Sequence, residues 1–127
     1  MKLIEAFAKD YTTLALADNV VLIEQAQNRV FYGREVVASI FHAFFAQGFS
    51  EVSVEVQSIV VNEDKCVMEF ILHGVHTGHF MSIVPTHRQI DMPMVLICEI
   101  QQQELYQATL YYDAGTLLRQ LGLAIKH

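Results

Sequence analysis

The sequence predicts a single α+β domain with helices first and an antiparallel meander of strands after them. Two early segments carry apolar residues at the three- and four-residue steps of an amphipathic helix, and after Gly48 the pattern changes to a period of two. Polar turns separate the long segments of the second half. Since 127 residues suffice for one domain with its own hydrophobic core, we expect residues 1–127 to form a single unit.

The first half of the chain contains both early helices and two short strands. Lys2–Leu16 has an apolar stripe and predicts the first helix, and the short, β-branched segment Val20–Glu24 predicts a strand. Val30–Tyr32 predicts a second short strand. Arg34–Gln47 has a broad apolar face and predicts the second helix, with Gly48 at the C′ position after its last turn.

The second half predicts four strands and a closing helix. Val52–Val56 alternates apolar and polar residues, and Asn62–Lys65 has the composition of a hairpin turn. The remaining strands and the final helix are expected, in chain order, at Cys66–Met81, Gln89–Ile100, Leu105–Asp113 and Ala114–Leu121. Gly74 and Gly78 fall within the first of these strands and predict a bulge or a bend there.

The expected strand Gln89–Ile100 is apolar on both faces. Its even-numbered residues from Ile90 onward share one face, and Val95 and Ile97 lie on the other. An antiparallel sheet with one face in water alternates more cleanly between apolar and polar residues. We therefore expect helices to cover one face of the sheet and a second copy of the chain to cover the outer face, which gives a homodimer.

The composition excludes several classes of partner. Hydrophobic residues make up 53% of the chain, and the net charge is −6 with only eight Lys and Arg. Nucleic acids and anionic membrane surfaces bind clustered basic residues, so neither is an expected partner. No segment has the roughly 20 apolar residues of a membrane span, and Glu5 and Lys9 interrupt the apolar region of a signal peptide. Cys66 and Cys98 are expected as buried, reduced thiols, so we predict a cytoplasmic protein.

Three motifs carry a resemblance to a known family. They are GVHTGHF at Gly74–Phe80, PTHR at Pro85–Arg88 and YYDAGTLLRQLG at Tyr111–Gly122. Together with the order of the elements, they resemble the SnoaL-like polyketide cyclase and ester cyclase group of the nuclear-transport-factor-2-like superfamily. The resemblance implies a cone-shaped fold with a pocket between a curved sheet and the helices. The chain departs from the family where His87 replaces a glycine and where no tryptophan precedes the aspartate.

Asp113 is the main candidate for catalysis. In SnoaL-like cyclases the matching aspartate is the acid/base that moves the proton during an intramolecular aldol closure. A carboxylate among aromatic and Met side chains would be desolvated, which raises its pKa toward working pH. Strand parity places Tyr111 with Asp113 on the expected pocket face, and Leu110 and Tyr112 on the partner face. The structural alternative is that Asp113 is the N-cap of the last helix, and both roles are compatible.

Three histidines, His73, His76 and His79, form the second group of candidates. Residues three apart on a strand point to opposite faces, and His73 and His79 lie about 20 Å apart at strand rise, so a metal site is not expected. By the resemblance, Thr77 and His79 match pocket-lining positions, and His79 near Asp113 could orient it or share its proton. Each histidine is also compatible with a structural role, and the sequence leaves open which one faces the pocket.

Five further residues are candidates for contact with a ligand. Tyr11 matches the position at which steroid isomerases of the superfamily place a hydrogen-bonding tyrosine, although it also belongs to the apolar stripe of the first helix. Phe44, Phe45, Met92 and Met94 are core residues by default, and some of them would line a pocket for an apolar ligand.

Two related chemistries lack residues that they need. Limonene-epoxide hydrolases of this superfamily use an arginine and a second aspartate where this chain has Thr77 and His79. Steroid isomerases use an aspartate base just after the first short strand. The nearest match in this chain is Gln25, with Glu24 adjacent, so that chemistry also loses its base.

We therefore expect a SnoaL-like enzyme that transfers protons on a small, largely apolar carbonyl compound and needs neither metal nor cofactor. Asp113 would be the acid/base, with His79 and Tyr111 as polar supports. The alternative is a non-catalytic ligand-binding or dimerisation module, because this scaffold hosts both enzymes and binders. The sequence is compatible with an active catalytic site and with an inactive one.

Overall fold

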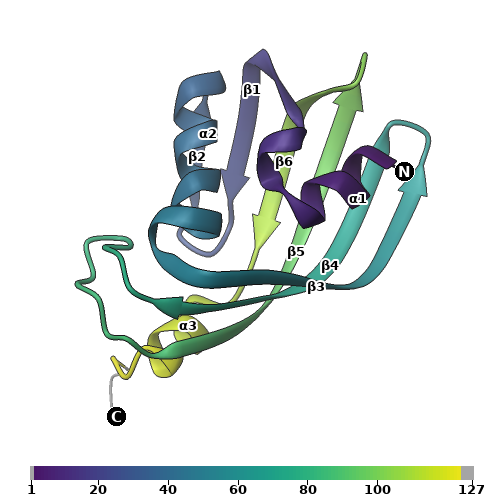
Figure 1. Cartoon of the computed structure of the whole chain (residues 1–127). Coiled ribbons are helices and arrows are strands. Elements are labelled where there is room, and N and C mark those ends of the chain that lie inside the picture. Colours follow the sequence, from purple (N-terminus) through teal and green to yellow (C-terminus); the bar gives the residue numbers. More distant parts are fainter. Residues whose placement is uncertain (1, 124–127) are drawn as a thin grey trace.

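The computed structural model of the protein describes residues 2–123. A strongly curved, six-stranded sheet holds two helices within its curve, and a third helix lies at one end (Figure 1). The helices are α1 (Lys2–Lys9), α2 (Arg34–His42) and α3 (Ala114–Gln120), with the short turns η1 (Tyr11–Thr13) and η2 (Ala43–Gln47) after the first two. α3 lies at the end of the sheet opposite the β3–β4 and β5–β6 hairpins. The architecture is α+β, as the sequence predicts.

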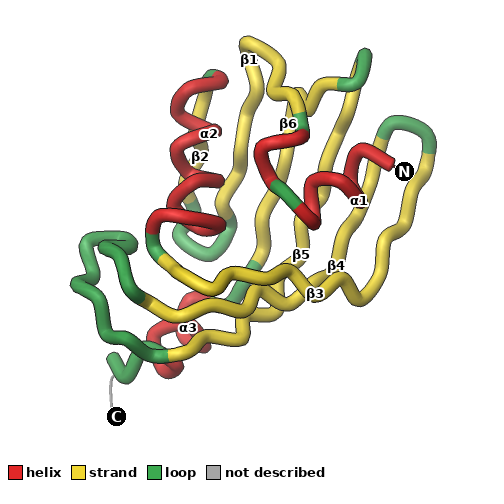
Figure 2. Tube along the Cα trace, viewed as in Figure 1, coloured by secondary structure: helices red, strands yellow, loops and turns green. Residues whose placement is uncertain are grey.

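The sheet contains six strands in a mixed order. They are β1 (Ala15–Glu24), β2 (Arg29–Tyr32), β3 (Phe49–Asn62), β4 (Lys65–His76), β5 (Gln89–Gln101) and β6 (Glu104–Tyr111). They lie side by side in the order β2-β1-β6-β5-β4-β3. The meander from β3 to β6 is antiparallel throughout, which confirms the prediction, and Figure 2 shows its turns. The parallel pairing of β1 with β6 is the exception to the predicted antiparallel sheet.

The core lies between the inner face of the sheet and the helices α1 and α2. The even-numbered residues of β5 from Ile90 to Ile100 are all buried there, as strand parity predicts. Phe7 of α1 packs edge-on against Phe41 of α2, with ring centres 5.7 Å apart. Full burial of one such side chain stabilises the fold by about 1.5–3 kcal/mol.

Among residues 2–123, no helix has the length and hydropathy that crossing a membrane requires.

The first helix is shorter than the sequence predicts. α1 ends at Lys9, and the chain enters β1 already at Ala15, so the predicted helix Lys2–Leu16 is wrong in its second half. The Asp10 side chain accepts a hydrogen bond from the backbone N–H of Thr12 at 3.0 Å and begins η1 instead. Aspartate and threonine side chains compete in this way with the helical hydrogen bonds of the backbone.

The strand before the longest loop is also shorter than predicted, since β4 ends at His76 and not at Met81. Gly78 N–H donates to the carbonyl of Gly48 at 3.1 Å, and a Cβ on Gly78 would lie only 2.0 Å from the carbonyl oxygen of Gln47. This close approach requires glycine and takes the chain out of the sheet. Gly48 itself has a φ of −77°, so it does not adopt the left-handed conformation expected at C′.

Candidate functional site

Asp113 lies at the start of α3, with its side chain 70% exposed. Its Oδ2 accepts hydrogen bonds from the backbone N–H of Thr116 at 3.2 Å and from the Thr116 hydroxyl at 2.6 Å, which makes Asp113 the N-cap of α3. These bonds, that of the Thr116 hydroxyl above all, hold the pKa of Asp113 below its usual value. The prediction that Asp113 is desolvated and has a raised pKa is therefore wrong. The structural alternative, an N-cap of the last helix, is observed. A catalytic role for Asp113 stays a prediction.

A bulge in β6 explains why Asp113 lies away from the core. The pairing of β6 with β5 shifts register near the start of β6, where Tyr106 is an extra residue. One extra residue reverses the face of every side chain that follows it. Tyr111 is consequently 42% exposed on the outer face, whereas Leu110 and Tyr112 are buried in the core. The predicted assignment of these residues to the pocket face and the partner face is reversed.

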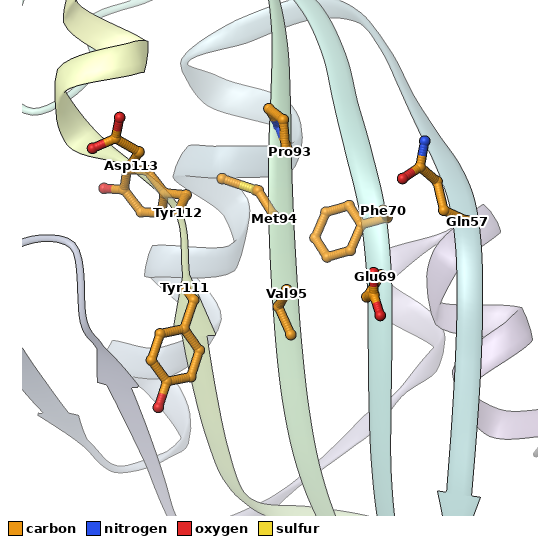
Figure 3. A pocket seen from close by; sticks show the side chains of 9 residues that line it. All are labelled: Gln57, Glu69, Phe70, Pro93, Met94, Val95, Tyr111, Tyr112 and Asp113. Carbon is orange, nitrogen blue, oxygen red and sulfur yellow. The ribbon is translucent and has the colours of Figure 1, made fainter.

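The outer face carries an open groove of about 420 Å³ beside Asp113 (Figure 3). Tyr111 and Asp113 line it from the end of β6, and Gln57 and Glu69 line it from β3 and β4. The groove runs across the strands and is open to water. Tyr111 and Asp113 are therefore together, as predicted, but on a surface and not in a pocket between the sheet and the helices.

The other predicted ligand contacts lie on the side of the sheet that the helices cover. Three of them belong to the buried core, namely Phe44, Met92 and Met94. Phe45 is half-buried and stacks on Tyr11 with ring centres 5.7 Å apart. The Tyr11 hydroxyl lies 2.7 Å from Nδ1 of His42, and Tyr11 lines a groove of about 290 Å³ between α1 and β3. Tyr11 is thus half-buried at the edge of this groove.

Of the three candidate histidines, His76 is the one that faces the interior. It is fully buried, and its Nδ1 accepts the backbone N–H of Thr86 at 3.1 Å, which ties together the two ends of the loop between β4 and β5. Burial lowers the pKa of His76. Thr77 and His79 lie in that loop with exposed side chains, whereas the resemblance implies that they lie on a strand that lines a pocket. Within residues 2–123, no group of three or more His, Cys, Asp or Glu side chains is placed to hold a metal ion.

His73 lies on the outer face between two carboxylates. Its Nδ1 is 2.6 Å from Oδ1 of Asp91, and its Nε2 is 2.8 Å from Oε1 of Glu55, so one ring connects β3, β4 and β5. Both ring nitrogens are donors only when the histidine is protonated. The hydrogen bond to Asp91 and then that to Glu55 therefore raise the pKa of His73.

We expect the His73 ion pairs to stabilise the fold more at about pH 6 than at about pH 9. The pKa of His73 in the folded state lies above the unfolded value of about 6.5, so the contribution is complete below that pH and is lost as the pH rises through the folded pKa. Urea unfolding of the wild type and of His73→Gln at both pH values measures this. The difference in unfolding free energy between the two proteins should shrink at high pH, and a constant difference would contradict the ion pairs.

A buried polar cluster lies on the inner face, where β1 and β6 end. Glu24, the last residue of β1, is only 2% exposed. Its Oε1 accepts the backbone N–H of Gln27 at 3.0 Å, and its Oε2 accepts a longer hydrogen bond of 3.4 Å from the Tyr112 hydroxyl. Nε2 of Gln27 donates to the same hydroxyl at 3.2 Å. We call Glu24, Gln27 and Tyr112 the Glu24 cluster.

Aromatic side chains surround the Glu24 cluster. The ring centre of Tyr112 lies 5.5 Å from that of Phe44, which lies 4.9 Å from that of Phe80. Burial raises the pKa of Tyr112 to about 12, so its hydroxyl keeps its proton at neutral pH. The cluster thus combines a buried carboxylate, a protonated hydroxyl and an amide in apolar surroundings. This is the environment that the sequence predicts around Asp113.

The alternation of apolar residues along β1 indicates that Glu24 is buried. The family motifs do not include Glu24. Val20, Leu22 and Glu24 share one face of the strand, and the first two are fully buried. A carboxylate at the next position of a buried face costs free energy unless it is hydrogen-bonded, so such a residue is a candidate functional group. Tyr112 has no comparable signal, because its face depends on the bulge at Tyr106.

Comparison with known proteins places the chain among SnoaL-like proteins. The family model described as SnoaL-like polyketide cyclase matches residues 5–121. Among curated proteins, none matches the chain. Of solved structures, TsrD from Streptomyces laurentii is 23% identical with a TM-score of 0.79, over 96% of this chain and 93% of that one. IdmH, a proposed polyketide cyclase from Streptomyces antibioticus, is 25% identical with a TM-score of 0.69, over 94% and 93%.

A third solved structure bears on the fold. A protein from Catenulispora acidiphila with a ketosteroid isomerase-like fold, in complex with trimethylamine, is 20% identical with a TM-score of 0.76, over 96% of this chain and 93% of that one. The likeness covers nearly all of both chains. It confirms the predicted fold, a curved sheet with N-terminal helices packed in its curve, and the family match confirms the predicted resemblance.

Proposed function

Because the chain belongs to the SnoaL-like polyketide cyclase family, we propose that it is a cyclase or isomerase that transfers protons on a small, largely apolar carbonyl compound. The observation that carries the proposal is the buried Glu24 carboxylate, which lies beside a tyrosine hydroxyl among apolar side chains. The reaction class is enolisation, in which a proton leaves the carbon next to a carbonyl group. Glu24, and not Asp113, is then the acid/base.

In this proposal Glu24 removes the proton from the α-carbon of the substrate. A side chain positioned to exchange a proton in the transition state contributes a factor of about 10²–10⁴ to the rate. The backbone N–H of Gln27 holds Oε1, which leaves Oε2 on the side of Tyr112. Once protonated, Glu24 returns the proton to a carbon or an oxygen of the product, so no metal or cofactor is needed for the cycle.

Tyr112 is the second participant. As the α-proton leaves, negative charge develops on the carbonyl oxygen, and a donor aimed at that oxygen stabilises the transition state. A pKa of about 12 keeps the Tyr112 hydroxyl protonated and able to donate. Phe44 and Phe80 exclude water from this side and favour a substrate with an apolar body.

A non-catalytic ligand-binding module is the second candidate function. The hydrogen bond from the backbone N–H of Gln27 to Oε1 of Glu24 spans three residues and also stabilises the turn between β1 and β2. If Glu24 serves only to stabilise that turn, the site would bind a ligand but would not catalyse a reaction. The two functions differ in one property, the ability to move a proton on a bound ketone.

Exchange of α-protons in deuterium oxide separates the two functions. The probe is indanone, a small bicyclic ketone, and nuclear magnetic resonance follows the loss of its α-proton signal. We expect exchange in the presence of the protein to be faster than in buffer alone. Binding of indanone without faster exchange would contradict the acid/base function and support the binding module.

We also propose that a second copy of the chain covers the outer face of the sheet. Val95 and Ile97 lie on that face of β5, half-buried in the single chain, and Tyr111 is 42% exposed beside them. β4 adds three further apolar residues there, Val67, Ile71 and Val75. Light scattering at micromolar concentration should give twice the mass of one chain, and the mass of a monomer would contradict the dimer.

A reducing compartment suits the two cysteines, which supports our proposal that the protein acts in the cytoplasm. Cys66 and Cys98 face each other across β4 and β5, and both are free, buried thiols. Burial raises the pKa of Cys98 to about 12, so it stays a thiol at neutral pH. Cytosolic glutathione and thioredoxin keep protein thiols reduced, so two neighbouring free thiols fit that compartment.

A further inference from the structure

Two hydrogen-bond donors of the Glu24 cluster converge on the side chain of Met81. Nε2 of Gln27 lies 3.1 Å from the Met81 sulfur, and the Tyr112 hydroxyl lies 3.8 Å from it. A thioether sulfur is a weak acceptor, whereas amide and phenol groups are good donors. Nε2 of Gln27 also donates to the Tyr112 hydroxyl, and that hydroxyl also donates to Glu24. At the position of the sulfur, however, both donors meet a weaker acceptor than an oxygen atom would be.

We propose that Gln27 and Tyr112 form a subsite for the oxygen of a carbonyl or enolate ligand, and that the Met81 side chain occupies this subsite and leaves it when the ligand binds. The inference rests on the proposed function and names the atoms that would receive the oxygen of its substrate. It also adds Met81 as the residue that limits access to the site.

The burial of Tyr112 is the first reason why an oxygen acceptor fits this place. The Tyr112 side chain is only 9% exposed, and the edge-on packing of its ring against Phe44 fixes the direction of the hydroxyl. A donor in such surroundings contributes more to binding than the same donor in water. The hydroxyl has one proton, so it donates either to Glu24 or to the ligand.

The position of Glu24 is the second reason. Its Oε2 lies 3.4 Å from the Tyr112 hydroxyl, and this hydroxyl lies 3.2 Å from Nε2 of Gln27, so the carboxylate and the two donors are neighbours. In a ketone the α-carbon is two bonds from the carbonyl oxygen. A ligand with its oxygen at Gln27 and Tyr112 would thus have its α-carbon on the side of Glu24, and removal of an α-proton needs this closeness of the base.

Met81 is held in a way that permits its displacement. Its side chain is 37% exposed, in contrast to its neighbour Phe80, which is 2% exposed and anchors the loop. Met81 and Ser82 have φ values of 51° and 65°, in the left-handed region that non-glycine residues avoid. A two-residue turn between antiparallel partners requires such values at both central residues, and mutual hydrogen bonds between Phe80 and Ile83 close this turn. Met81 therefore lies at the tip of a turn, outside the core. Rotation of one flexible side chain is enough to vacate the subsite.

Binding of a matched pair of probes tests the subsite without any need for turnover. Indanone has the carbonyl group, and indane has the same rings without it. Titration of each probe, followed by nuclear magnetic resonance, gives its Kd for the wild type and for Met81→Ala. We expect Met81→Ala to bind indanone about tenfold more tightly than the wild type does, with a smaller gain for indane. Met81→Leu, which keeps the bulk of the side chain, should bind both probes as the wild type does.

Two results would overturn the subsite. An equal gain for indane and indanone would mean that Met81 only fills apolar space, and no gain for either would mean that it does not block the site. The double variant Gln27→Ala, Met81→Ala should lose the preference for the ketone, and a retained preference would exclude Gln27 as a donor. A ketone preference without α-proton exchange would leave the subsite standing and remove the proposed acid/base function, so the two failures are distinguishable.

Discussion

Glu24→Gln should reduce protein-catalysed α-proton exchange of indanone by a factor of about 100 to 10,000. Glutamine has nearly the same shape, and its amide oxygen can still accept the N–H of Gln27, but it has no basic group at the pH of the assay. The substitution therefore removes the proton acceptor and leaves the surrounding packing in place. The exchange rate at equal protein concentration, measured by nuclear magnetic resonance in deuterium oxide, gives the factor.

A matched control excludes a general effect of removing one negative charge. Glu63 is exposed in the turn between β3 and β4, at the far end of the sheet from Glu24. Glu63→Gln should exchange indanone protons at the wild-type rate. If Glu24→Gln also retains that rate while both variants stay folded, Glu24 is not the base.

Phe80→Ala should lower the free energy of unfolding by about 3–5 kcal/mol. The Phe80 ring lies 4.9 Å from that of Phe44 and 5.0 Å from that of Phe49, and its side chain is 2% exposed although it belongs to a loop. Truncation leaves a cavity under η2 and detaches the loop between β4 and β5 from the core. Urea unfolding of the wild type and the variant measures the loss.

The loop offers its own control for this stability prediction. Val84 is 64% exposed in the same segment, and Val84→Ala should change the free energy of unfolding by no more than about 0.5 kcal/mol. A loss below about 1 kcal/mol for Phe80→Ala would show that the loop contributes little to the core and would contradict the anchoring role of Phe80.

The elements of the second half are the part of the fold that the sequence predicts well. Alternation with a period of two and polar turns place β4, β5 and β6 within two residues of their bounds, apart from the end of β4, whereas the predicted segment Val52–Val56 covers only the middle of β3. β4 ends early because Gly78 approaches the backbone of Gly48, a contact between residues 30 positions apart. Contacts of that kind have no local pattern in the sequence.

The face assignments near the C-terminus fail for one reason. A period of two, extended from Leu105 to Asp113, places Tyr111 inside and Tyr112 outside, but the extra residue at Tyr106 reverses both. A bulge depends on how two strands pair, so the alternation of one strand does not show it. The same bulge places Tyr112, and not Tyr111, on the inner face beside Glu24.

The family motif and the buried face give different catalytic candidates. Asp113 belongs to a motif, but its carboxylate caps a helix and is mostly in water. Glu24 belongs to no motif, but it extends the buried face that begins with Val20 and Leu22. A motif shows where a residue lies in the chain. The acid/base properties of its side chain depend on burial and hydrogen bonding, and these are defined only in the folded sheet.

The central claim is that the acid/base lies on the inner face, at Glu24, and not on the outer face at Asp113. Exchange of indanone α-protons, measured side by side for Glu24→Gln and Asp113→Asn, tests it most directly. We expect Glu24→Gln to lose the catalysed exchange and Asp113→Asn to retain most of it, because asparagine caps a helix about as well as aspartate does. Loss of exchange in Asp113→Asn with retention in Glu24→Gln would contradict the account.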